Sequence, residues 1–409
     1  MTESLIVSPP SAPIAIGLKL PVSKSISNRA LIMASLCGSR NAIKEVSDSD
    51  DSIRLDRSLA TWPYEMDCGA GGTTLRFLLA RCAIREGEEH ILTGIPRLLE
   101  RPHGELVDAL VSIGGQVERI PQGFRVRGKK LKGGHIHMNG SISSQFISAL
   151  LMIAPYTQQG IQIEWQGEIT SAPYVAMTVQ LMQQYGAHVV MESDRITVEP
   201  GGYSMEQLVI PYDRSAAAFW YEIAALSRAA QIELVGEDDG GGQGDAIAAE
   251  LWQHWVLTRR ERSGTILSHR EPTVRHKEFH FDLGRTPDLF QPLAITCAAA
   301  GATAVYTGLG TLPLKETDRI VATQKILRSF GGDILARPND HWIGPIDLRE
   351  RRTSRPALID PQGDHRMAMA AAPLCIIAGP LRILQSAVVA KSYPQFWRDL
   401  ELAGFSIEY

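Results

Sequence analysis

The sequence predicts an α/β protein made of two similar domains, each containing three repeated units. The chain has 409 residues, which is too many for one ordinary hydrophobic core and indicates two or three domains. Two internal repeats divide the chain into about six units of roughly 70 residues each. Six such units are most simply grouped as two domains of three.

The first repeat is a short polar stretch followed by an apolar helix. In its first copy, LPVSKSISNRALIMASL, small hydroxyl residues and cations lead into the apolar run. Copies of the repeat start near six residues: Ser25, Thr73, Ser144, Ser215, Asp288 and His365. Four of the five gaps between these starts are 71 to 77 residues long. Such regular spacing predicts a recurring supersecondary unit.

The second repeat is an amphipathic helix that ends at a glycine and continues into an alternating strand. Its clear copies have their glycines at Gly114, Gly186, Gly331 and Gly404, and a degraded copy lies near residue 258. A glycine just after the last helical residue is a common C-terminal cap. The repeat therefore predicts surface helices that lead into strands.

Composition and charge narrow the class of protein. The hydrophobic content of 44% is typical of soluble proteins, and the formal net charge of −4 argues against a nucleic-acid partner. No 18-residue apolar run predicts a membrane span, and the first residues do not resemble a secretory signal. The scattered cysteines predict reduced thiols in the cytoplasm and no zinc site. They are Cys37, Cys68, Cys82, Cys297 and Cys375.

The polar helix starts predict an anion site. A helix N-terminus has unpaired N–H groups and a partial positive charge, so it binds phosphate or carboxylate. Capping explains one Ser, Thr or Asp per helix, but it does not explain the neighbouring cations. These are Lys24, Arg29, Arg76, Arg101, Lys315, Arg319, Arg366 and Lys391. Arginine suits planar recognition of both anions, so we expect substrates that carry at least one phosphate and at least one carboxylate.

Two acidic residues stand at similar positions. Asp288 precedes an apolar helix, and Glu316 lies between Lys315 and Arg319. A carboxylate beside cations stays ionised at neutral pH and can accept a proton from an alcohol. From its own stretch of sequence alone, Asp288 is equally compatible with an ordinary N-cap.

Nine segments in family order carry a resemblance to a known family. They are KSISNRALIMASL, GAGGTTLRF, LTGIPRLLERPHGELVDAL, SSQFISALL, SAPYVAMT, TPDLFQPLA, LPLKETDRI, DHRMAMA and AKSYP. With them the chain resembles the 5-enolpyruvylshikimate 3-phosphate (EPSP) synthases from about Lys24 to Lys391.

The resemblance implies a fold of two similar domains, each of three βαβαββ-type units, with the buried helices pointing their N-termini at the interdomain cleft. It also implies that the chain crosses twice between the domains. Residues 1–18 and 213–409 would form the domain with Asp288 and the cations on the phosphoenolpyruvate side. Residues 19–212 would form the domain that binds shikimate 3-phosphate.

The implied reaction joins phosphoenolpyruvate to the 5-hydroxyl of shikimate 3-phosphate and releases phosphate through a tetrahedral intermediate. It belongs to the route to chorismate and the aromatic amino acids. The resemblance implies no metal and no organic cofactor, and we expect a monomer. Because Gly72 matches the glyphosate-sensitive type, we also expect glyphosate to compete with phosphoenolpyruvate.

The resemblance also implies roles for single residues. Those implied for shikimate 3-phosphate are Lys24, Ser25, Arg29, Ser143, Ser144, Gln145, Ser171, Tyr174, Asp288, Thr311 and Lys315. Those implied for phosphoenolpyruvate are Lys24, Gly72, Arg101, Gln145, Arg319, Arg366 and Lys391. Those implied for catalysis are Asp288 as proton acceptor, with Glu316, Lys391 and Lys24. Many members of the family have Asn where this chain has Ala70 and Thr311.

Three other readings of the sequence stay open at this point. The sister transferase acting on UDP-N-acetylglucosamine uses a loop cysteine, for which Cys68 is the one candidate here. A nucleotide enzyme similar to RNA 3′-phosphate cyclases would want a basic RNA surface, which the net charge disfavours. A non-catalytic phosphometabolite-binding protein could lose Asp288 or Glu316, yet both are present. Residues 236–245, GEDDGGGQGD, are expected to form a flexible acidic loop.

Overall fold

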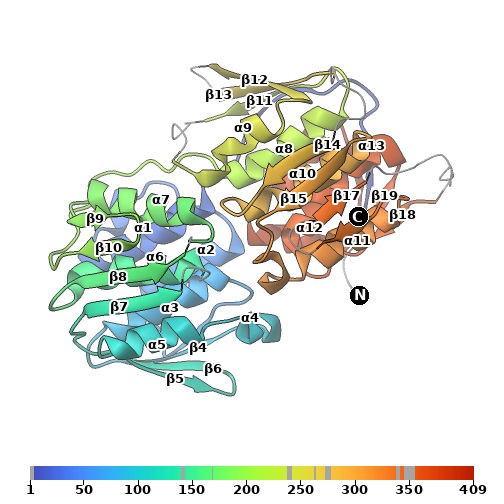
Figure 1. Cartoon of the computed structure of the whole chain (residues 1–409). Helices are drawn as coiled ribbons and strands as arrows, with labels where there is room; N and C mark the ends of the chain where they lie inside the picture. Colours follow the sequence, from blue (N-terminus) through green and yellow to red (C-terminus); the bar gives the residue numbers. More distant parts are fainter. Residues whose placement is uncertain are drawn as a thin grey trace. The chain divides into compact units, whose positions relative to one another are not determined.

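In the computed structural model the chain folds into two compact units (Figure 1). The structure describes residues 4–139, 143–167, 169–236, 242–261, 264–271, 278–337, 341–344 and 355–409. Unit 1 consists of Met1–Pro21 and Pro211–Tyr409, and unit 2 consists of Val22–Ile210. These bounds lie within three residues of the crossings that the family resemblance implies. Each unit has its own hydrophobic core.

The sheets of unit 2 follow the βαβαββ pattern. The first sheet contains β3 (Glu65–Asp67), β4 (Glu89–Thr93), β5 (Gln116–Ile120) and β6 (Gly123–Arg127). The second contains β7 (Gly134–Asn139), β8 (Ile161–Gln166), β9 (Val189–Met191) and β10 (Arg195–Val198). The orders are β3-β4-β6-β5 and β7-β8-β10-β9. In both sheets the first two strands are parallel and the other pairs are antiparallel.

Unit 1 repeats the same order in three sheets, two of which contain a strand from the N-terminal segment. The first sheet contains β14 (Glu278–Asp282), β15 (Thr303–Thr307), β16 (Ile334–Ala336) and β17 (His341–Ile343). The second contains β2 (Ala15–Lys19), β11 (Gln231–Val235), β12 (Val256–Glu261) and β13 (Gly264–His269). The third contains β1 (Ser4–Ser8), β18 (Ala357–Ile359), β19 (Leu381–Leu384) and β20 (Ser406–Glu408). Because β1 lies between β19 and β20, and β2 pairs with β11, the N-terminal segment belongs to unit 1.

The repeats are less uniform than six equal units would be. The described part contains five four-stranded sheets of identical order. Around residues 22–64 the described residues show helices and one parallel bridge, Ile43 to Leu208, in place of a sheet. Near residue 258, where the sequence repeat is degraded, the helix α9 (Ala248–Leu251) is short, but β12 and β13 are complete. The helix is therefore what has degraded there, and the sheet is kept.

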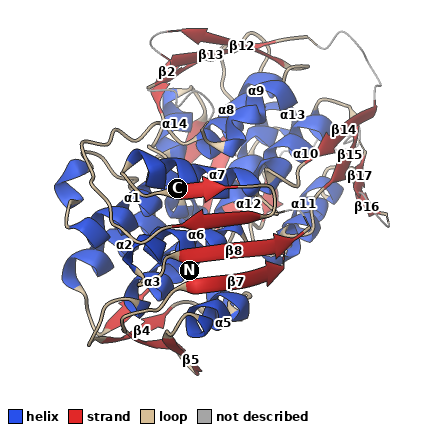
Figure 2. Cartoon of the chain, turned by 60° about the vertical axis from the view of Figure 1, so that its left-hand side comes forward, coloured by secondary structure: helices blue, strands red, loops and turns tan. Residues whose placement is uncertain are grey.

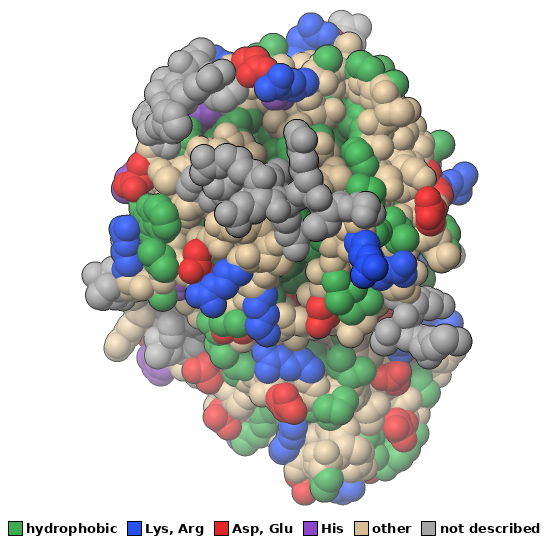
Figure 3. Space-filling view, turned by 90° about the vertical axis from the view of Figure 1, so that its right-hand side faces the viewer, with side chains coloured by type: hydrophobic (Ala, Val, Ile, Leu, Met, Phe, Trp, Pro, Cys, Tyr) green, Lys and Arg blue, Asp and Glu red, His purple; other side chains and the backbone are tan. Residues whose placement is uncertain are grey.

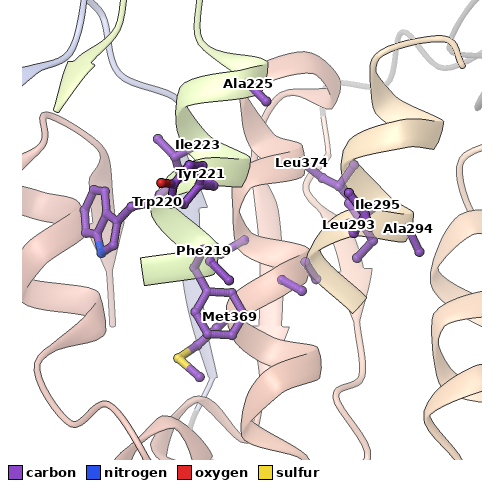
Figure 4. Packing of buried hydrophobic residues seen from close by; sticks show 14 of the residues in the cluster. Phe219, Trp220, Tyr221, Ile223, Ala225, Leu293, Ala294, Ile295, Met369 and Leu374 are labelled. Carbon is purple, nitrogen blue, oxygen red and sulfur yellow. The ribbon is translucent and has the colours of Figure 1, made fainter. Parts of the chain in front are cut away.

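The first sequence repeat is confirmed as a set of buried helices. They are α1 (Lys24–Cys37), α3 (Gly72–Ala83), α6 (Ser144–Ile153), α8 (Arg214–Leu226), α10 (Phe290–Ala299) after the short 3₁₀ helix η4 (Pro287–Leu289), and α12 (His365–Ala371). Each begins within one residue of the predicted start. In unit 2, α1, α3 and α6 pack on one another, and in unit 1, α8, α10 and α12 do so. Figure 4 shows apolar side chains of this second trio, such as Phe219 and Met369, pointing toward one another.

The second repeat is confirmed as well. Its helices are α5 (Gly104–Ser112), α7 (Ala172–Gln184), α11 (Arg319–Arg328) and α14 (Phe396–Leu402). Each is followed by one of the predicted glycines, whose φ angles lie between 82° and 102°. A side chain at such a φ is strained, so glycine is the residue that lets the chain turn from helix into strand.

The remaining elements are short connections and one longer helix. They are α2 (Asp50–Thr61), α4 (Pro96–Glu100), α13 (Cys375–Ala378), η1 (Arg40–Ala42), η2 (Ala154–Tyr156), η3 (Gly244–Ile247), η5 (Leu312–Leu314), η6 (Ala372–Leu374) and η7 (Ser386–Lys391).

Figure 2 shows helices and strands throughout the chain. On the face drawn in Figure 3, basic and acidic side chains are interspersed. None of the helices in the described ranges has the length and apolarity needed to cross a membrane.

Candidate functional site

Residues predicted from sequence, together with Asp51, gather in unit 2 around the starts of four helices. We call this set the unit 2 cluster. It consists of Lys24, Ser25, Arg29, Asp51, Gly72, Arg76, Arg101, Ser143, Ser144, Gln145, Ser171 and Tyr174. The cap of α1 is Ser23, whose hydroxyl accepts a hydrogen bond from the Ile26 N–H. Since Ser23 performs the capping, Ser25 and Lys24 are not needed for it.

Lys24 is tied to the start of α3 through a buried carboxylate. Its Nζ donates to Asp51 Oδ2 over 3.1 Å, and the Asp51 side chain is only 4% exposed. The backbone oxygen of Asp51 accepts from Thr74 Oγ1 at 2.8 Å. This chain of contacts holds α1, α2 and α3 in a fixed arrangement, so the direction of the Lys24 side chain is set by packing.

Two guanidinium groups flank Gly72 at the first turn of α3. A methyl group built at Gly72 would lie 2.9 Å from Arg101 Nη1 and 3.2 Å from Arg76 Nη1. Arg76 donates to Gln145 Oε1 at 2.6 Å and to the Pro102 oxygen at 3.1 Å. Arg76 thereby orients the Gln145 amide, and the small Gly72 leaves room for both arginines.

Arg29 is buried, and most of its hydrogen bonds are made inside unit 2. Its Nε donates to Thr178 Oγ1 at 2.7 Å, its Nη2 to Ser148 Oγ and to the Tyr174 oxygen, and its Nη1 to the Ser25 oxygen. Burial lowers the pKa of Arg29 to about 10, while Tyr174 opposes this. Four of the five N–H donors of the guanidinium are used in these contacts.

The serines of the cluster stand at the starts of α6 and α7. Ser143 caps α6, accepting from the Gln145 N–H, and Ser144 follows as the first helical residue. Ser171 precedes α7 with a left-handed backbone, at φ 59° and ψ 38°, and its side chain makes no cap hydrogen bond. Non-glycine residues held in this conformation are strained and concentrate at functional sites. The Tyr174 N–H donates to the Ser171 oxygen, which joins this turn to Arg29.

A second set, made of predicted residues together with Asp364, lies in unit 1, where all members except Thr311 are joined by ion pairs. We call it the unit 1 cluster: Asp288, Thr311, Lys315, Glu316, Arg319, Asp364, Arg366 and Lys391. At its centre, Asp288 Oδ1 lies 2.8 Å from Arg319 Nη1 and 3.2 Å from Lys315 Nζ. Asp288 Oδ2 lies 3.1 Å from Arg366 Nη2. One carboxylate therefore contacts three cations from two separate segments, residues 315–319 and Arg366.

The three cations decide the ionisation of Asp288. Burial by itself would raise its pKa, but the charges of Arg366, Lys315 and Arg319 outweigh burial and hold the pKa well below its ordinary value. Asp288 is thus a carboxylate at neutral pH. It lies inside η4, whose N-cap is Thr286, and its side chain faces the cations. Of the two readings left open by the sequence, an N-cap and an ionised acid, the structure supports the second.

Glu316 and Lys391 form a direct pair beside this centre. Lys391 Nζ donates to Glu316 Oε1, and Arg319 Nη2 donates to Glu316 Oε2 at 3.1 Å. Arg319 is 2% exposed, and its Nε lies 2.7 Å from Asp364 Oδ2. Burial would lower the pKa of Arg319, but Asp364, Glu316 and Asp288 together raise it. Arg319 is therefore permanently charged and holds three carboxylates at once: Asp288, Glu316 and Asp364.

Thr311 lies in the turn that leads through η5 to Lys315. Its hydroxyl oxygen is buried, and it has no hydrogen-bond partner among the described residues. A buried hydroxyl without a partner is costly unless a ligand or water satisfies it. This placement is compatible with the ligand contact that the resemblance implies.

Three residues of these surroundings were not assigned to the site by sequence reasoning, and a fourth, Arg76, was named only as one of the cations. Asp51 and Arg76 orient Lys24 and Gln145, and Asp364 both caps α12 and holds Arg319. Asp245 falls in the stretch predicted to be a flexible acidic loop. Residues 237–241 of that stretch lie outside the described residues, but Asp245 lies in η3 and is 2% exposed. For that residue the loop prediction is wrong, since its carboxyl accepts a hydrogen bond from Ser215.

Comparisons with known proteins identify the family of the chain and agree with its fold. The model of the family EPSP synthase (3-phosphoshikimate 1-carboxyvinyltransferase) matches residues 53–400. The 3-phosphoshikimate 1-carboxyvinyltransferase of Bacteroides fragilis strain YCH46 is 39% identical over 398 residues, 96% of each chain. The chain belongs to the EPSP synthase family. A Methanospirillum hungatei protein of the same name is 30% identical and covers 95% of this chain and 96% of its own.

Solved structures show the same fold at lower identity. EPSP synthase from Acinetobacter baumannii superposes with a TM-score of 0.77 at 19% identity, covering all of both chains. The enolpyruvyl transferase NikO from Streptomyces tendae gives 0.74 at 14%, covering 100% of this chain and 99% of its own. Because transferases with different titles share this fold, the EPSP synthase assignment depends on the sequence matches. The likeness to the solved structures shows the fold alone.

The structure argues against the alternative of the sister transferase acting on UDP-N-acetylglucosamine, which uses a loop cysteine. Cys68 is completely buried. Burial raises the pKa of its thiol well above the ordinary value, and the neighbouring Cys82 adds to this. A reactive cysteine needs an accessible thiol with a lowered pKa, so Cys68 is unsuited to act as an acid toward a substrate.

Proposed function

We propose that this chain transfers the enolpyruvyl group of phosphoenolpyruvate to the 5-hydroxyl of shikimate 3-phosphate and releases inorganic phosphate. The observation that carries the proposal is Asp288, a carboxylate kept ionised by three cations in a member of the EPSP synthase family. An ionised carboxylate beside cations can accept the hydroxyl proton while the cations bind substrate anions.

Eight residues of the unit 2 cluster are assigned to shikimate 3-phosphate. The phosphate group suits Ser143, Ser144 and Ser171, because they stand where α6 and α7 begin and backbone N–H groups are unpaired there. Lys24, Ser25, Arg29, Gln145 and Tyr174 are assigned to the rest of the molecule. Asp288, Thr311 and Lys315 of unit 1 are assigned to its hydroxyl groups.

Phosphoenolpyruvate carries a phosphate and a carboxylate, and five cations are assigned to them. They are Lys24 and Arg101 of unit 2 and Arg319, Arg366 and Lys391 of unit 1. Gly72 and Gln145 complete the set. Arg101 and Arg366 offer the planar donor pairs that suit these anions.

The proposed chemistry moves two protons. Asp288 accepts the proton of the 5-hydroxyl while the hydroxyl oxygen forms a bond to C2 of phosphoenolpyruvate. An acid adds a proton to C3. Glu316 and Lys391, which share a hydrogen bond, are assigned to this second transfer. The same pair then takes a proton back from C3 of the tetrahedral intermediate while the bond between C2 and the phosphate oxygen breaks, which restores the double bond and releases inorganic phosphate. The balance needs no oxidant and no metal.

We also propose that the enzyme acts as a monomer in the cytoplasm. All five cysteines are free thiols in the structure, as expected in a reducing compartment. Size-exclusion chromatography with light scattering tests the monomer, for which the mass of the chain is 44.8 kDa.

The decisive assay mixes the purified chain with shikimate 3-phosphate and phosphoenolpyruvate and measures released phosphate and the enol ether product. Lys24→Met is expected to lose most of the turnover, because it removes the cation assigned to both substrates. The matched control is Lys325→Met on the exposed last turn of α11, which should keep wild-type turnover. If the wild-type chain forms no enol ether from these substrates, the proposal is wrong.

A further inference from the structure

The turn at residues 243–245 is attached to the start of α8, one of the three buried helices of unit 1. Gln243 Nε2 donates to the Tyr212 oxygen at 2.8 Å, and Gln243 Oε1 accepts from the Arg214 N–H at 3.2 Å. Ser215 Oγ donates to Asp245 Oδ2. These bonds place a buried carboxyl group at the N-terminus of α8, in a segment that none of the nine family motifs covers.

The same end of α8 is close to the catalytic centre assigned above. The helix packs against η3 with Asp245, against η4 with Asp288, and against α12 with Arg366. Burial raises the pKa of Asp245 to about 6, the charge of Arg366 opposes this, and the charge of Asp288 adds to it. Arg366 therefore lies within electrostatic reach of two carboxyl groups, of which Asp288 makes the direct ion pair.

Other charged groups on the packed elements have smaller or no roles. Asp213, the cap of α8, adds a weak repulsion that raises the pKa of Asp245 further. Arg214 stacks on the ring of Tyr212 at 4.7 Å, and Glu250 on α9 is exposed. The charge state of Asp245 thus depends mainly on its burial, on Arg366, on Asp288 and on the Ser215 hydroxyl.

We propose that Asp245 is a positioning residue whose carboxylate, held by Ser215, shares the charge of Arg366 with Asp288 and so keeps Asp288 effective as the base. An ionised Asp245 attracts the positive charge of Arg366 and repels the negative charge of Asp288. Both effects raise the proton affinity of Asp288. A protonated Asp245 leaves Arg366 to Asp288 alone, which weakens the base. This inference rests on the proposed function, because that proposal makes Asp288 the base.

The kinetic test uses Asp245→Asn and Ser215→Ala in the full-length chain. With wild type, kcat is expected to fall to a lower plateau as the pH drops through about 6. Asp245→Asn should stay at the lower plateau from pH 5 to 8, with kcat reduced about tenfold at pH 7.5. The KM for phosphoenolpyruvate should not rise in this variant, because a negative charge near Arg366 has been removed.

Ser215→Ala gives a second variant with a different signature. The Ser215 hydrogen bond lowers the pKa of Asp245, so removing it should shift the inflection in kcat to higher pH while leaving both plateaus in place. A purely structural role predicts another result, namely a higher KM for phosphoenolpyruvate and an unchanged inflection. That result, or a wild-type kcat profile in Asp245→Asn, overturns the inference.

A binding arm separates this inference from the proposed function. Sulfate, whose charge is constant between pH 5 and 8, is titrated calorimetrically into wild type and Asp245→Asn. Wild type should bind sulfate more weakly than the variant at pH 7.5, by about threefold, and equally at pH 5. If the wild-type chain proves inactive but this difference is present, the electrostatic coupling stands and the proposed reaction fails. Equal affinities at both pH values refute the coupling.

Discussion

The two clusters have similar numbers of cations but differ in the carboxylates that accompany them. The unit 2 cluster has Lys24, Arg29, Arg76 and Arg101 with one carboxylate, Asp51. The unit 1 cluster has Lys315, Arg319, Arg366 and Lys391 with three carboxylates, Asp288, Glu316 and Asp364. The unit 2 cluster therefore has an excess of positive charge, whereas the charges in the unit 1 cluster nearly cancel.

This difference indicates different roles for the two clusters. An excess of positive charge with hydroxyl groups and helix starts suits a phosphate dianion, which brings the missing negative charge. Paired charges suit proton transfer, because each carboxylate has cations that set its proton affinity. The two buried arginines show the contrast. Burial lowers the pKa of Arg29 to about 10, whereas three carboxylates raise that of Arg319.

The largest expected effect comes from breaking the charge balance in unit 1. Asp288→Asn keeps the shape of the side chain but removes the proposed base, so kcat should fall by about 10² to 10⁴. The three cations then lose their common partner, so inorganic phosphate should bind more tightly than to wild type. Stopped assays of phosphate release and calorimetry with phosphate measure the two effects.

A matched control for Asp288→Asn exists in unit 2. Asp51→Asn likewise removes a carboxylate from a cation, Lys24, but Asp51 has no part in the proposed proton transfers. Its kcat should fall far less than that of Asp288→Asn. Equal losses in the two variants would contradict the division of work between the clusters.

A smaller effect is expected from crowding the excess cations of unit 2. Gly72→Ala places a methyl group 2.9 Å from Arg101 Nη1, which must push that guanidinium aside. The KM for phosphoenolpyruvate should rise roughly tenfold, because misplacing a binding group by a fraction of an ångström is costly. The KM for shikimate 3-phosphate should change little. Steady-state kinetics with each substrate varied in turn will check both statements.

Glyphosate inhibition gives a second readout of the same variant. We expect wild type to be inhibited competitively with phosphoenolpyruvate and Gly72→Ala to be inhibited less. The control is Gly104→Ala at the first turn of α5, where a methyl group meets nothing within 4 Å. Wild-type kinetics in Gly72→Ala would show that Arg101 is not confined as the structure indicates.

Much of the fold could be predicted from the sequence because the repeats are local patterns. Helix starts are marked by small polar residues, and helix ends by glycines that must adopt a positive φ, such as Gly114 and Gly404. The reduced repeat at residues 22–64 was not foreseen. Its helices α1 and α2 keep the repeat's helical pattern, whereas the loss of a sheet concerns pairing with distant segments such as Leu208.

The candidate site was predictable in its residue types but not in its pairings. The motifs point to Arg319 and Asp288, and the structure shows that they pair with each other. Asp245 was missed, because glycines and acids around it are typical of an exposed loop. Its burial comes from Gln243 and Ser215, which are distant in sequence from one another. Local sequence patterns do not predict contacts between residues that are distant in sequence.

The cores of the two units also differ, and the difference should appear in how stability depends on pH. In unit 1, Glu222 is completely buried, both its oxygens lack partners among the described residues, and burial raises its pKa well above the ordinary value. Folded Glu222 keeps a proton that the unfolded chain releases above about pH 4.5. Its contribution to stability is therefore complete below that pH and is lost as the pH rises.

Glu222→Gln removes this titration, so its melting temperature should fall less than that of wild type between pH 5 and 8. A difference of 1 kcal/mol corresponds to about 2–4 °C. Ser148→Ala in α6 of unit 2 is the control, because Ser148 is buried but bonded to Arg29 and Thr178. It should lower the melting temperature by a constant amount at every pH. A wild-type pH slope in Glu222→Gln would mean that Glu222 is hydrated.

The smallest effect concerns the strained turn before α7. Ser171 has a left-handed backbone, which costs a residue other than glycine about 1–2 kcal/mol. Glycine relieves this strain but adds about 0.5–1 kcal/mol of disorder to the unfolded chain. The free energy of unfolding of Ser171→Gly should therefore change by about 1 kcal/mol or less. Ser143→Gly is the matched variant, since φ there is −58° and no strain is relieved, so it should be less stable than Ser171→Gly.

Kinetics complete the comparison of these two turns. Both variants remove a hydroxyl assigned to the phosphate of shikimate 3-phosphate, so both should raise its KM several-fold, as the loss of one hydrogen bond to a charged group implies. Urea unfolding and steady-state assays separate the backbone effect from the ligand effect. If Ser171→Gly loses as much stability as Ser143→Gly, the left-handed backbone stores no strain. In that case the left-handed conformation of Ser171 has no energetic cost that the ligand site would need to explain.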